Sequence, residues 1–214
     1  MSTSPTTPPS EKETGRLEAF SDGVLAVAIT LLALNISVPG RESGRAWHGL
    51  TAALAGQWPV YLAYLLSFLT ILIMWVNHHN MFKLIERVDH LFLLLNGALL
   101  LVITLFPFAT ILLADYIEQP DKKTAQIIYA GISLIMALVF NTLWRYASRQ
   151  GGLLSAAADQ KQVQAITKRF RFGPLLYLAT FVLAFISAEV SLAACIGLAI
   201  FFAIPSDLLQ RQRA

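Results

Sequence analysis

The sequence predicts an all-α integral membrane protein with six transmembrane helices. Of its 214 residues, 56% are hydrophobic and only 14% are charged, whereas a soluble domain usually carries about 25% charged residues. Long apolar stretches replace the half-polar surface of a soluble protein, and a helix that crosses a bilayer needs about 20 apolar residues. The chain therefore has room for about six spans with short connections.

The two ends of the chain are expected to lie outside the membrane. Residues 1–15 interleave Ser, Thr and Pro, a composition typical of a disordered tail. They lack the basic start and short apolar core of a secretory signal, so we expect the first apolar run to stay in the mature protein. The predicted organisation is a disordered cytoplasmic tail over 1–15, a six-helix transmembrane domain over 16–205 and a cytoplasmic tail over 206–214.

The first four spans follow from the apolar runs and from the residues that interrupt them. Pro39-Gly40 ends the first run, and Pro59 stands in the first turn of the second, where proline is favoured. Pro107 falls inside the third run, so we expect a kink there. The spans are predicted at residues 17–38, 58–77, 90–114 and 125–146.

The last third of the chain is harder to divide. Residues 148–170 are polar, yet Val163, Ile166 and Phe170 recur at helical spacing among basic residues, which predicts a helix lying on the membrane surface. Residues 172–204 would make a single helix about 50 Å long, which exceeds the hydrocarbon thickness. We therefore predict two short helices joined by a tight turn at Ala188-Glu189.

The basic residues predict the orientation. With the N-terminus inside, 12 of the 16 Lys and Arg residues fall in inner segments and 4 in outer ones, and cytoplasmic loops carry such an excess. Both termini are therefore expected in the cytoplasm. The membrane in which we expect the protein is the plasma membrane. The net charge of +3 reflects this topology and does not indicate nucleic-acid binding.

The first predicted helix carries most of the functional information. Residues placed at 100° intervals put Val27, Thr30, Leu31 and Leu34 on one stripe, which Phe20 and Val24 extend toward the cytoplasm. Asp22 lies about 140° from Val27, so its carboxyl group turns toward neighbouring helices. From periodicity alone the stripe is either ordinary helix-packing surface or, if several subunits meet on an axis, a series of hydrophobic rings with threonine hydroxyls between them.

The motif Arg16-x-x-x-Phe20-Ser21-Asp22-Gly23, at the start of a first span with a later threonine, resembles the signature of the transmembrane protein 175 family of potassium channels. The resemblance extends over the predicted spans and the His- and Asn-bearing segments. It implies a homotetramer with an ion pore on the symmetry axis, lined by the first helices. The carbonyl-lined Thr-Val-Gly-Tyr-Gly loop of conventional potassium channels does not occur in this sequence.

The resemblance also assigns roles to individual residues. The family's hydrophobic constriction, usually isoleucine or leucine, falls on Val27, the threonine on Thr30 and a second apolar ring on Leu34. Valine is smaller, so the narrowest ring could instead be Leu31 or Leu34. A hydrogen-bonded network is implied that fixes the pore helix to the second and third helices, with these members: Arg16, Phe20, Ser21, Asp22, Trp75, Asn77, His78 and Asn96.

Other polar residues have simpler explanations. His78 and His79 are adjacent on a helix and point about 100° apart, so a shared metal ion is not expected, and interfacial hydrogen bonding is. Glu189 is interpreted as an exposed turn residue, and Cys195 as a small buried residue without a disulfide partner. We find no nucleophile with a base, no phosphate-binding glycine loop and no metal motif, and we expect neither enzymatic activity nor a cofactor.

Two functions remain open at this stage. The first is a passive cation channel in the bilayer, selective for K⁺ over Na⁺ and lined by Val27, Thr30, Leu31 and Leu34. The alternative is a proton-coupled secondary transporter that uses Asp22 and His78 as a relay. Internal repeats, which are common among transporters, are not apparent in the sequence, and this favours a channel assembled by oligomeric symmetry.

Overall fold

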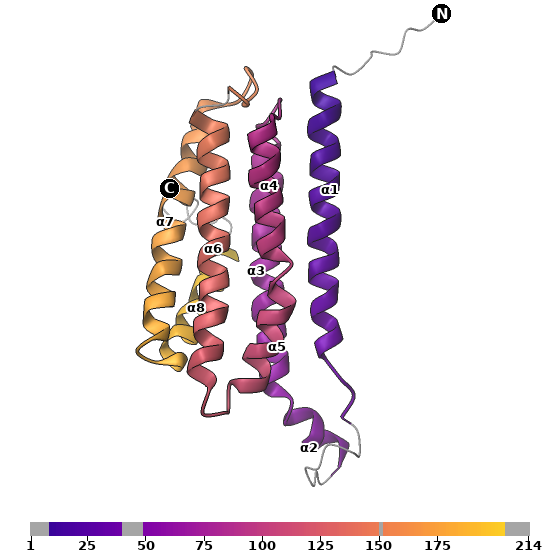
Figure 1. Ribbon diagram of the computed structural model, residues 1–214, viewed down its shortest axis with the longest axis vertical. Helices are drawn as coiled ribbons and strands as arrows, with labels where there is room; N and C mark the ends of the chain where they lie inside the picture. Colours follow the sequence, from indigo (N-terminus) through magenta and orange to yellow (C-terminus); the bar gives the residue numbers. More distant parts are fainter. Residues whose placement is uncertain (1–8, 40–48, 150–151, 204–214) are drawn as a thin grey trace, which may run out of the picture.

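The structure, a computed structural model, describes residues 9–39, 49–149 and 152–203, and these are helical apart from short connections (Figure 1). The long helices stand side by side and run along the longest axis of the molecule. In chain order the elements are α1 (Pro9–Leu32), the 3-10 helix η1 (Ala33–Asn35), α2 (Leu50–Ala55), α3 (Trp58–Phe82), α4 (His90–Ile103), α5 (Phe106–Tyr116), α6 (Lys122–Arg149), α7 (Gln160–Ala184) and α8 (Ala188–Ala203).

The prediction of an all-helical membrane protein is confirmed. Within the described residues, four stretches are long and apolar enough to cross a membrane. The helix α8 is apolar but shorter, and α7 carries several basic residues in its first half. The four stretches are Glu13–Asn35, Trp58–Phe82, His90–Tyr116 and Lys122–Arg149.

The first two spans differ in length from the prediction. The helix α1 begins at Pro9, so residues 9–15 are not a disordered tail, while the rest of that tail and the tail at 206–214 lie outside the described residues. The helix α3 runs five residues past the expected end at residue 77. His78 and His79, which follow the expected end, lie within the helix and bond to neighbouring helices.

The expected kink at Pro107 is a complete break between two helices. The helix α4 ends at Ile103, and α5 begins at Phe106 with Pro107 in its first turn. Proline is tolerated there because the first N–H groups of a helix have no intrahelical partner. The helices α4 and α5 together form one membrane-length segment.

The last third contains two helices joined by a short turn, as predicted, but the separate surface helix was wrong. One continuous helix, α7, replaces the predicted surface helix and the span after it. Val163 and Phe170 are buried against the bundle, and Ile166 packs on the same core, so the apolar side that suggested a membrane surface faces protein. The turn to α8 lies at 185–187, before the predicted Ala188-Glu189, and Ser187 accepts a hydrogen bond from the backbone N–H of Val190.

A side chain of α6 compensates for the proline inside α7. Pro174 has no N–H, so the carbonyl of Phe170, four residues earlier, lacks its helical partner. The side-chain amide of Asn141 donates to that carbonyl at 2.8 Å. The helix can therefore continue through the proline, which is why α7 is one helix and not two.

We expect Asn141→Leu to lower the free energy of unfolding by about 1–2 kcal/mol, because the Phe170 carbonyl loses its donor. In a Pro174→Ala background the backbone N–H of residue 174 can bond to that carbonyl, so the same substitution should cost less. Thermal unfolding in detergent measures both losses. Thr142→Ala is the control, since the Thr142 hydroxyl donates to the Leu138 carbonyl of its own helix. Equal losses in the two backgrounds would contradict this explanation.

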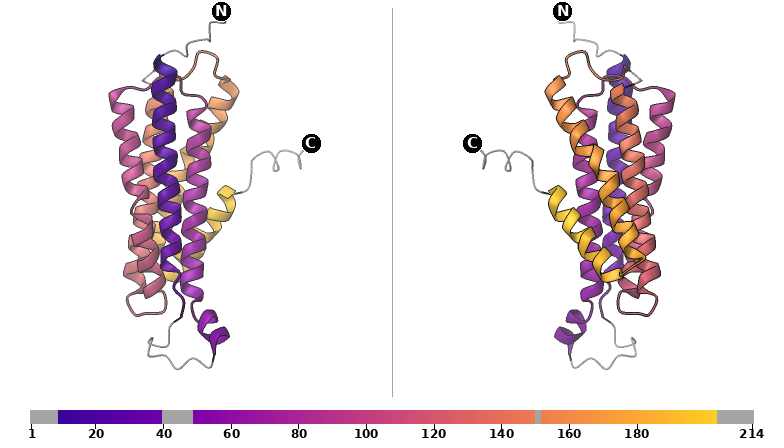
Figure 2. Two further views of the ribbon diagram at one scale, coloured as in Figure 1. Left: turned by 90° about the vertical axis from the view of Figure 1, so that its right-hand side faces the viewer. Right: turned by 90° about the vertical axis from the view of Figure 1, so that its left-hand side faces the viewer.

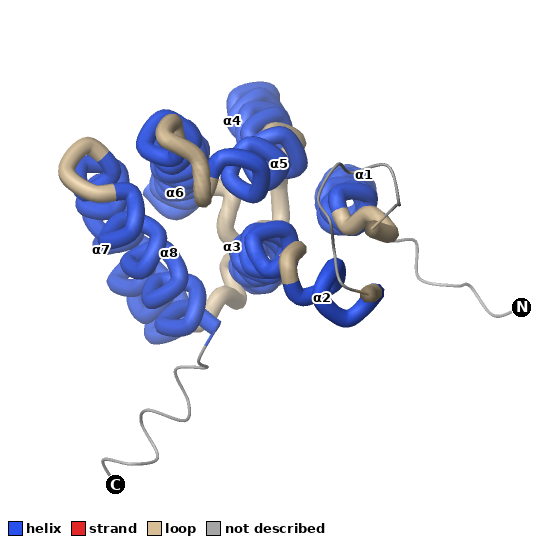
Figure 3. Tube along the Cα trace, turned by 90° about the horizontal axis from the view of Figure 1, so that it is seen from below, coloured by secondary structure: helices blue, strands red, loops and turns tan. Residues whose placement is uncertain are grey.

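The arrangement of the helices places α1 and α7 at opposite sides of the bundle. Viewed along the helices, α1 lies at one edge, α3, α4 and α5 lie in the middle, and α6, α7 and α8 lie beyond them (Figure 3). The side views agree, with the first residues of α1 and α7 at the same end (Figure 2). Fully buried aromatic side chains fill the bundle: Phe92 contacts Phe82 on α3, Phe106 contacts Tyr129 on α6, and Trp144 contacts Phe170 on α7.

Candidate functional site

The helix α1 has one buried face and one free face. Ser21, Leu25, Ala28 and Leu32 follow each other at intervals of three and four residues and are at most 1% exposed. This spacing places them on one side of the helix, which packs against α3, α4 and α5. The opposite side is therefore available to a further partner.

The predicted stripe lies on this free face. Val27 is 57% exposed, Leu31 42% and Leu34 76%, and Thr30 is exposed between them. The Thr30 hydroxyl donates to the carbonyl of Val27 at 2.9 Å, so its oxygen lone pairs point away from the helix backbone. Leucine and valine at such exposure need an apolar partner, either lipid or protein.

Two hydrogen bonds join the middle of α1 to the second half of α3. The indole N–H of Trp75 donates to a carboxyl oxygen of Asp22 at 2.9 Å, and His79 bonds to Glu18 at 3.0 Å. Each pair uses residues four apart on its own helix, so both bonds lie on one face of antiparallel helices. The Trp75 and His79 rings also stack, with centroids 5.9 Å apart. Asp22 thus turns toward α3 and away from the stripe.

A second, fully buried chain of hydrogen bonds links three helices. The side-chain N–H of Asn96 on α4 donates to the hydroxyl of Ser21 on α1 at 2.9 Å, and its oxygen lies 3.0 Å from Nε2 of His78 on α3. Because that amide oxygen can only accept, Nε2 of His78 carries the hydrogen. The Ser21 hydroxyl in turn donates a hydrogen bond to the Leu17 carbonyl at 2.8 Å. Asn96 is therefore the hub between α1 and α3.

Three residues expected in this network lie elsewhere. Arg16 is exposed and forms no ion pair with the described residues; its position on the helix places it on the same side as Leu34. Asn77 lines a small cavity with Thr70, Met74 and Phe140, on the side of α3 facing α6 and α7. Phe20 is 62% exposed and extends the stripe.

Two residues of the network were missed. Glu18 and His79 were not among the expected members, yet they form the pair next to Asp22 and Trp75. The signal was the spacing, since Glu18 precedes Asp22 by four residues and His79 follows Trp75 by four. Residues four apart lie one helical turn apart on the same face. Two antiparallel helices that meet at Asp22 and Trp75 therefore also bring Glu18 and His79 together, one turn further along.

Further polar contacts lie at the ends of the bundle. Asp89 caps α4 by accepting from the Phe92 N–H at 2.8 Å, and it accepts from the Tyr146 hydroxyl. These bonds stabilise the charged form and hold the pKa of Asp89 below its usual range. At the other end Glu189 is exposed, as expected, and pairs with Lys122.

Neither the histidines nor the cysteine forms a metal site in the described part of the chain. No group of three or more His, Cys, Asp or Glu side chains gathers there in a way that could hold an ion. Cys195 is buried beside the amide of Gln126, as expected for a small core residue. His78 and His79 both serve in hydrogen bonds between helices.

Comparison with known proteins identifies the family to which this architecture belongs. Residues 16–107 match the family described as endosomal/lysosomal potassium channel TMEM175. A potassium channel of Chamaesiphon minutus is 51% identical over 199 residues, which cover 93% of this chain and 98% of that protein. The chain belongs to the TMEM175 family.

Further TMEM175 relatives agree with this assignment. A potassium channel of Streptomyces collinus is 44% identical over 192 residues, covering 89% of this chain and 91% of its own length. The crystal structure of a TMEM175 homolog from C. minutus, described as a lysosomal potassium-selective channel, superposes with a TM-score of 0.81 over 90% of this chain and 97% of that one, at 51% identity. These relatives are ion channels and not enzymes, which agrees with the expectation that the chain is not an enzyme.

The matched residues of the TMEM175 family contain the whole site. They include the stripe on α1 and every member of the two hydrogen-bonded groups, from Glu18 to Asn96. The helices α6, α7 and α8 lie outside that segment but within the region shared with the C. minutus relative. The family resemblance read from Arg16 to Gly23 is thus confirmed over most of the chain.

Proposed function

We propose that the chain is a passive potassium channel, with α1 lining a pore on the axis of a homotetramer. The observation that carries the proposal is the free face that runs along α1 and η1, where Val27, Leu31 and Leu34 are exposed while the opposite face is buried. Four copies meeting along this face would cover the apolar side chains and convert each position into a ring. Two relatives are named as potassium channels, which supports K⁺ as the permeating ion.

The rings would differ in chemistry along the axis. Rings of valine and leucine make a narrow, poorly wetted constriction that resists ions unless it widens. The Thr30 hydroxyl already donates to the Val27 carbonyl, so its oxygen is free to face a cation and replace part of its hydration shell. Permeating K⁺ would need no bound cofactor. K⁺, which is larger and more weakly hydrated than Na⁺, is favoured at such a site.

The proposed membrane arrangement has six crossings with both termini in the cytoplasm. Four segments have the length and hydropathy of spans, and the α7–α8 hairpin supplies the remaining two. The excess of basic residues near the end of the bundle where α1 begins favours that end as cytoplasmic. In a bacterial cell this corresponds to the plasma membrane.

The contacts of Asp22 and His78 speak against the transporter alternative. Asp22 accepts from the indole of Trp75, a group that donates only and cannot pass a proton on. His78 is bonded to Asn96, and its Nδ1 has no hydrogen-bond partner among the described residues. Asp22 and His78 therefore share no direct hydrogen bond along which a proton could pass.

We expect Thr30→Ala and Leu34→Ala each to weaken potassium selectivity, because each removes a ring of the proposed pore. The reversal potential of purified protein in planar bilayers, with K⁺ on one side and Na⁺ on the other, measures this. A tenfold loss of the permeability ratio moves the potential of a monovalent ion by about 59 mV.

The control is Leu101→Ala on α4, which truncates a leucine that is 66% exposed but not on α1. It should leave the reversal potential unchanged. Selectivity that survives both α1 substitutions would place the filter elsewhere, and saturable, pH-coupled flux without current would restore the transporter alternative.

A further inference from the structure

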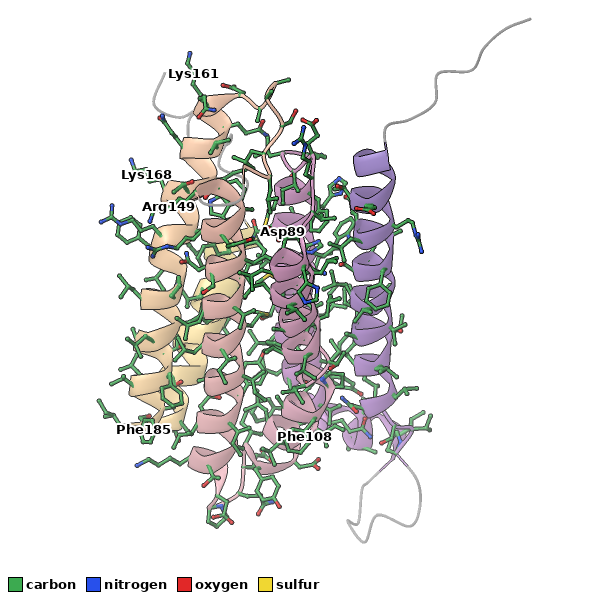
Figure 4. All side chains as sticks on the ribbon, turned by 45° about the horizontal axis from the view of Figure 1, so that its top comes forward. Asp89, Phe108, Arg149, Lys161, Lys168 and Phe185 are labelled. Carbon is green, nitrogen blue, oxygen red and sulfur yellow. The ribbon has the colours of Figure 1, made fainter. Side chains whose placement is uncertain are left out.

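A basic cavity opens between α6 and α7, on the side of the bundle away from α1. Its volume is about 660 Å³. Arg145 and Arg149 project into it from α6, and Lys168 and Arg171 from α7. Figure 4 shows Arg149 and Lys168 on the outer side of these two helices, with α1 at the far side of the bundle.

The four cations have no acidic partners among the described residues. The residues that line the cavity include no Asp or Glu, and neither ion pair of the described part of the chain involves the four. The carboxyl group of Asp89, near the same end, already accepts hydrogen bonds from the Tyr146 hydroxyl and the Phe92 N–H. Four like charges around one cavity repel each other, so the arrangement favours an anionic occupant.

An apolar groove continues from the cavity. Arg145, Arg149 and Arg171 also line this second hollow, of about 720 Å³. Its wall is formed by apolar side chains from α4, α6 and α7, of which Leu91 is 47%, Leu138 48% and Leu175 60% exposed. A ligand that fills both spaces must be anionic at one end and apolar along the other.

The position of the cavity along the helices matches the phosphate layer of a membrane. The helix α6 has 28 residues and is about 42 Å long, close to the roughly 40–45 Å thickness of a bilayer with its headgroups. Arg145 and Arg149 occupy its last two turns. In the orientation proposed above, they stand at the headgroups of the cytoplasmic leaflet, and the apolar groove lies at the depth of the acyl chains.

We infer that this cavity binds an anionic phospholipid of the cytoplasmic leaflet, with the phosphate between Arg145, Arg149 and Arg171 and an acyl chain along the groove. Guanidinium groups suit a phosphate because their planar fork donates two parallel hydrogen bonds. The inference rests on the proposed membrane orientation and adds a lipid partner to the proposed channel. Since α7 lies opposite the pore helix (Figure 3), the site faces lipid in the proposed tetramer.

The test compares two lipids with the same acyl chains, dioleoyl phosphatidylglycerol and dioleoyl phosphatidylcholine. Delipidated full-length protein is titrated with each lipid, and native mass spectrometry counts the bound molecules. We expect phosphatidylglycerol to bind more tightly than phosphatidylcholine. Arg145→Gln/Arg171→Gln should weaken phosphatidylglycerol binding by roughly 30-fold and leave phosphatidylcholine binding unchanged.

The control is Lys83→Gln/Lys161→Gln, which removes the same charge from exposed positions at the same end of the bundle, outside the cavity. It should bind phosphatidylglycerol like the unmodified protein. Arg145 and Arg171 are also exposed, so their substitution removes no core packing, and circular dichroism verifies the fold. Should Arg171→Gln alone be the better folded variant, a smaller loss in the same direction is expected.

Three outcomes would overturn the inference. One is equal affinity of the unmodified protein for the two lipids, and another is equal loss in the cavity variant and the control variant. The third is competition by soluble glycerol 3-phosphate as effective as that by the lipid, which would make this a site for free phosphate compounds. None of these readouts depends on ion conduction, so failure here is distinguishable from failure of the channel proposal.

Discussion

Asn96→Leu is expected to lower the free energy of unfolding by about 2 kcal/mol. Asn96 is fully buried and is the common partner of Ser21 on α1 and His78 on α3. Leucine fills a similar volume but leaves the His78 N–H without an acceptor, and a buried unsatisfied donor costs about 1–3 kcal/mol. Average hydrogen bonds between membrane helices contribute less, about 0.6 kcal/mol, because their partners find replacements. The buried surroundings of Asn96 offer none.

Thermal unfolding of the detergent-solubilised protein measures this loss. The chain supplies a matched control in Asn77→Leu, because Asn77 precedes His78 on α3 but faces the cavity toward α6 and α7. That variant adds apolar contact without breaking either group of hydrogen bonds, so its unfolding midpoint should stay near that of the unmodified protein. If both variants lost the same stability, the hub role of Asn96 would be wrong.

Asp22→Ala is expected to reduce tetramer assembly before it alters selectivity. The substitution removes the acceptor of the Trp75 N–H, a loss of about 1–2 kcal/mol per subunit. Asp22 lies on the side of α1 that meets α3, whereas the free face carries Val27, Leu31 and Leu34. A loosely held α1 presents that face less precisely. The proposed assembly contains four subunits, so the tetramer loses about four times the stabilisation that one subunit loses.

Asp22→Asn separates the structural role from a proton-carrying one. Asparagine keeps an oxygen that can accept from Trp75, so the tetramer and the potassium current should persist. Size-exclusion chromatography with light scattering measures assembly of both variants, and planar bilayers measure the current. Normal tetramers of Asp22→Ala would contradict the structural role, and a current abolished by Asp22→Asn with intact tetramers would favour a titrating carboxyl group.

The contrast between Asp22 and Arg16 shows how far the sequence alone could predict the site. The helix period predicted that Asp22 points away from the stripe, and its hydrogen bond with Trp75 agrees with this prediction. The same argument applied to Arg16 would have put it on the side of Leu34, away from the other network residues. Grouping residues because they share one motif hid that difference, since neighbours in sequence point in different directions around a helix.

The last third of the chain shows where hydropathy fails. The basic residues of α7 and the apolar repeat of Val163, Ile166 and Phe170 fit a surface helix and a packed helix equally well, because both present one apolar side. The partner of that side decided between them, and the partner is α6, which is distant in sequence. Likewise, only the position of Asn141 beside the Phe170 carbonyl explains why Pro174 does not end the helix.

The sequence by itself determined the helical membrane class, an interruption near Pro107, the grouping of Val27, Thr30, Leu31 and Leu34 on one side of α1, and the family, because these depend on local composition, period and motif. The tertiary structure decided which polar residues meet: Glu18 with His79, Asn96 with both Ser21 and His78, and Arg145 and Arg149 of α6 with Lys168 and Arg171 of α7. Hydrogen bonds and charge clusters form between atoms a few ångströms apart, and the fold alone brings such residues together from distant parts of the chain.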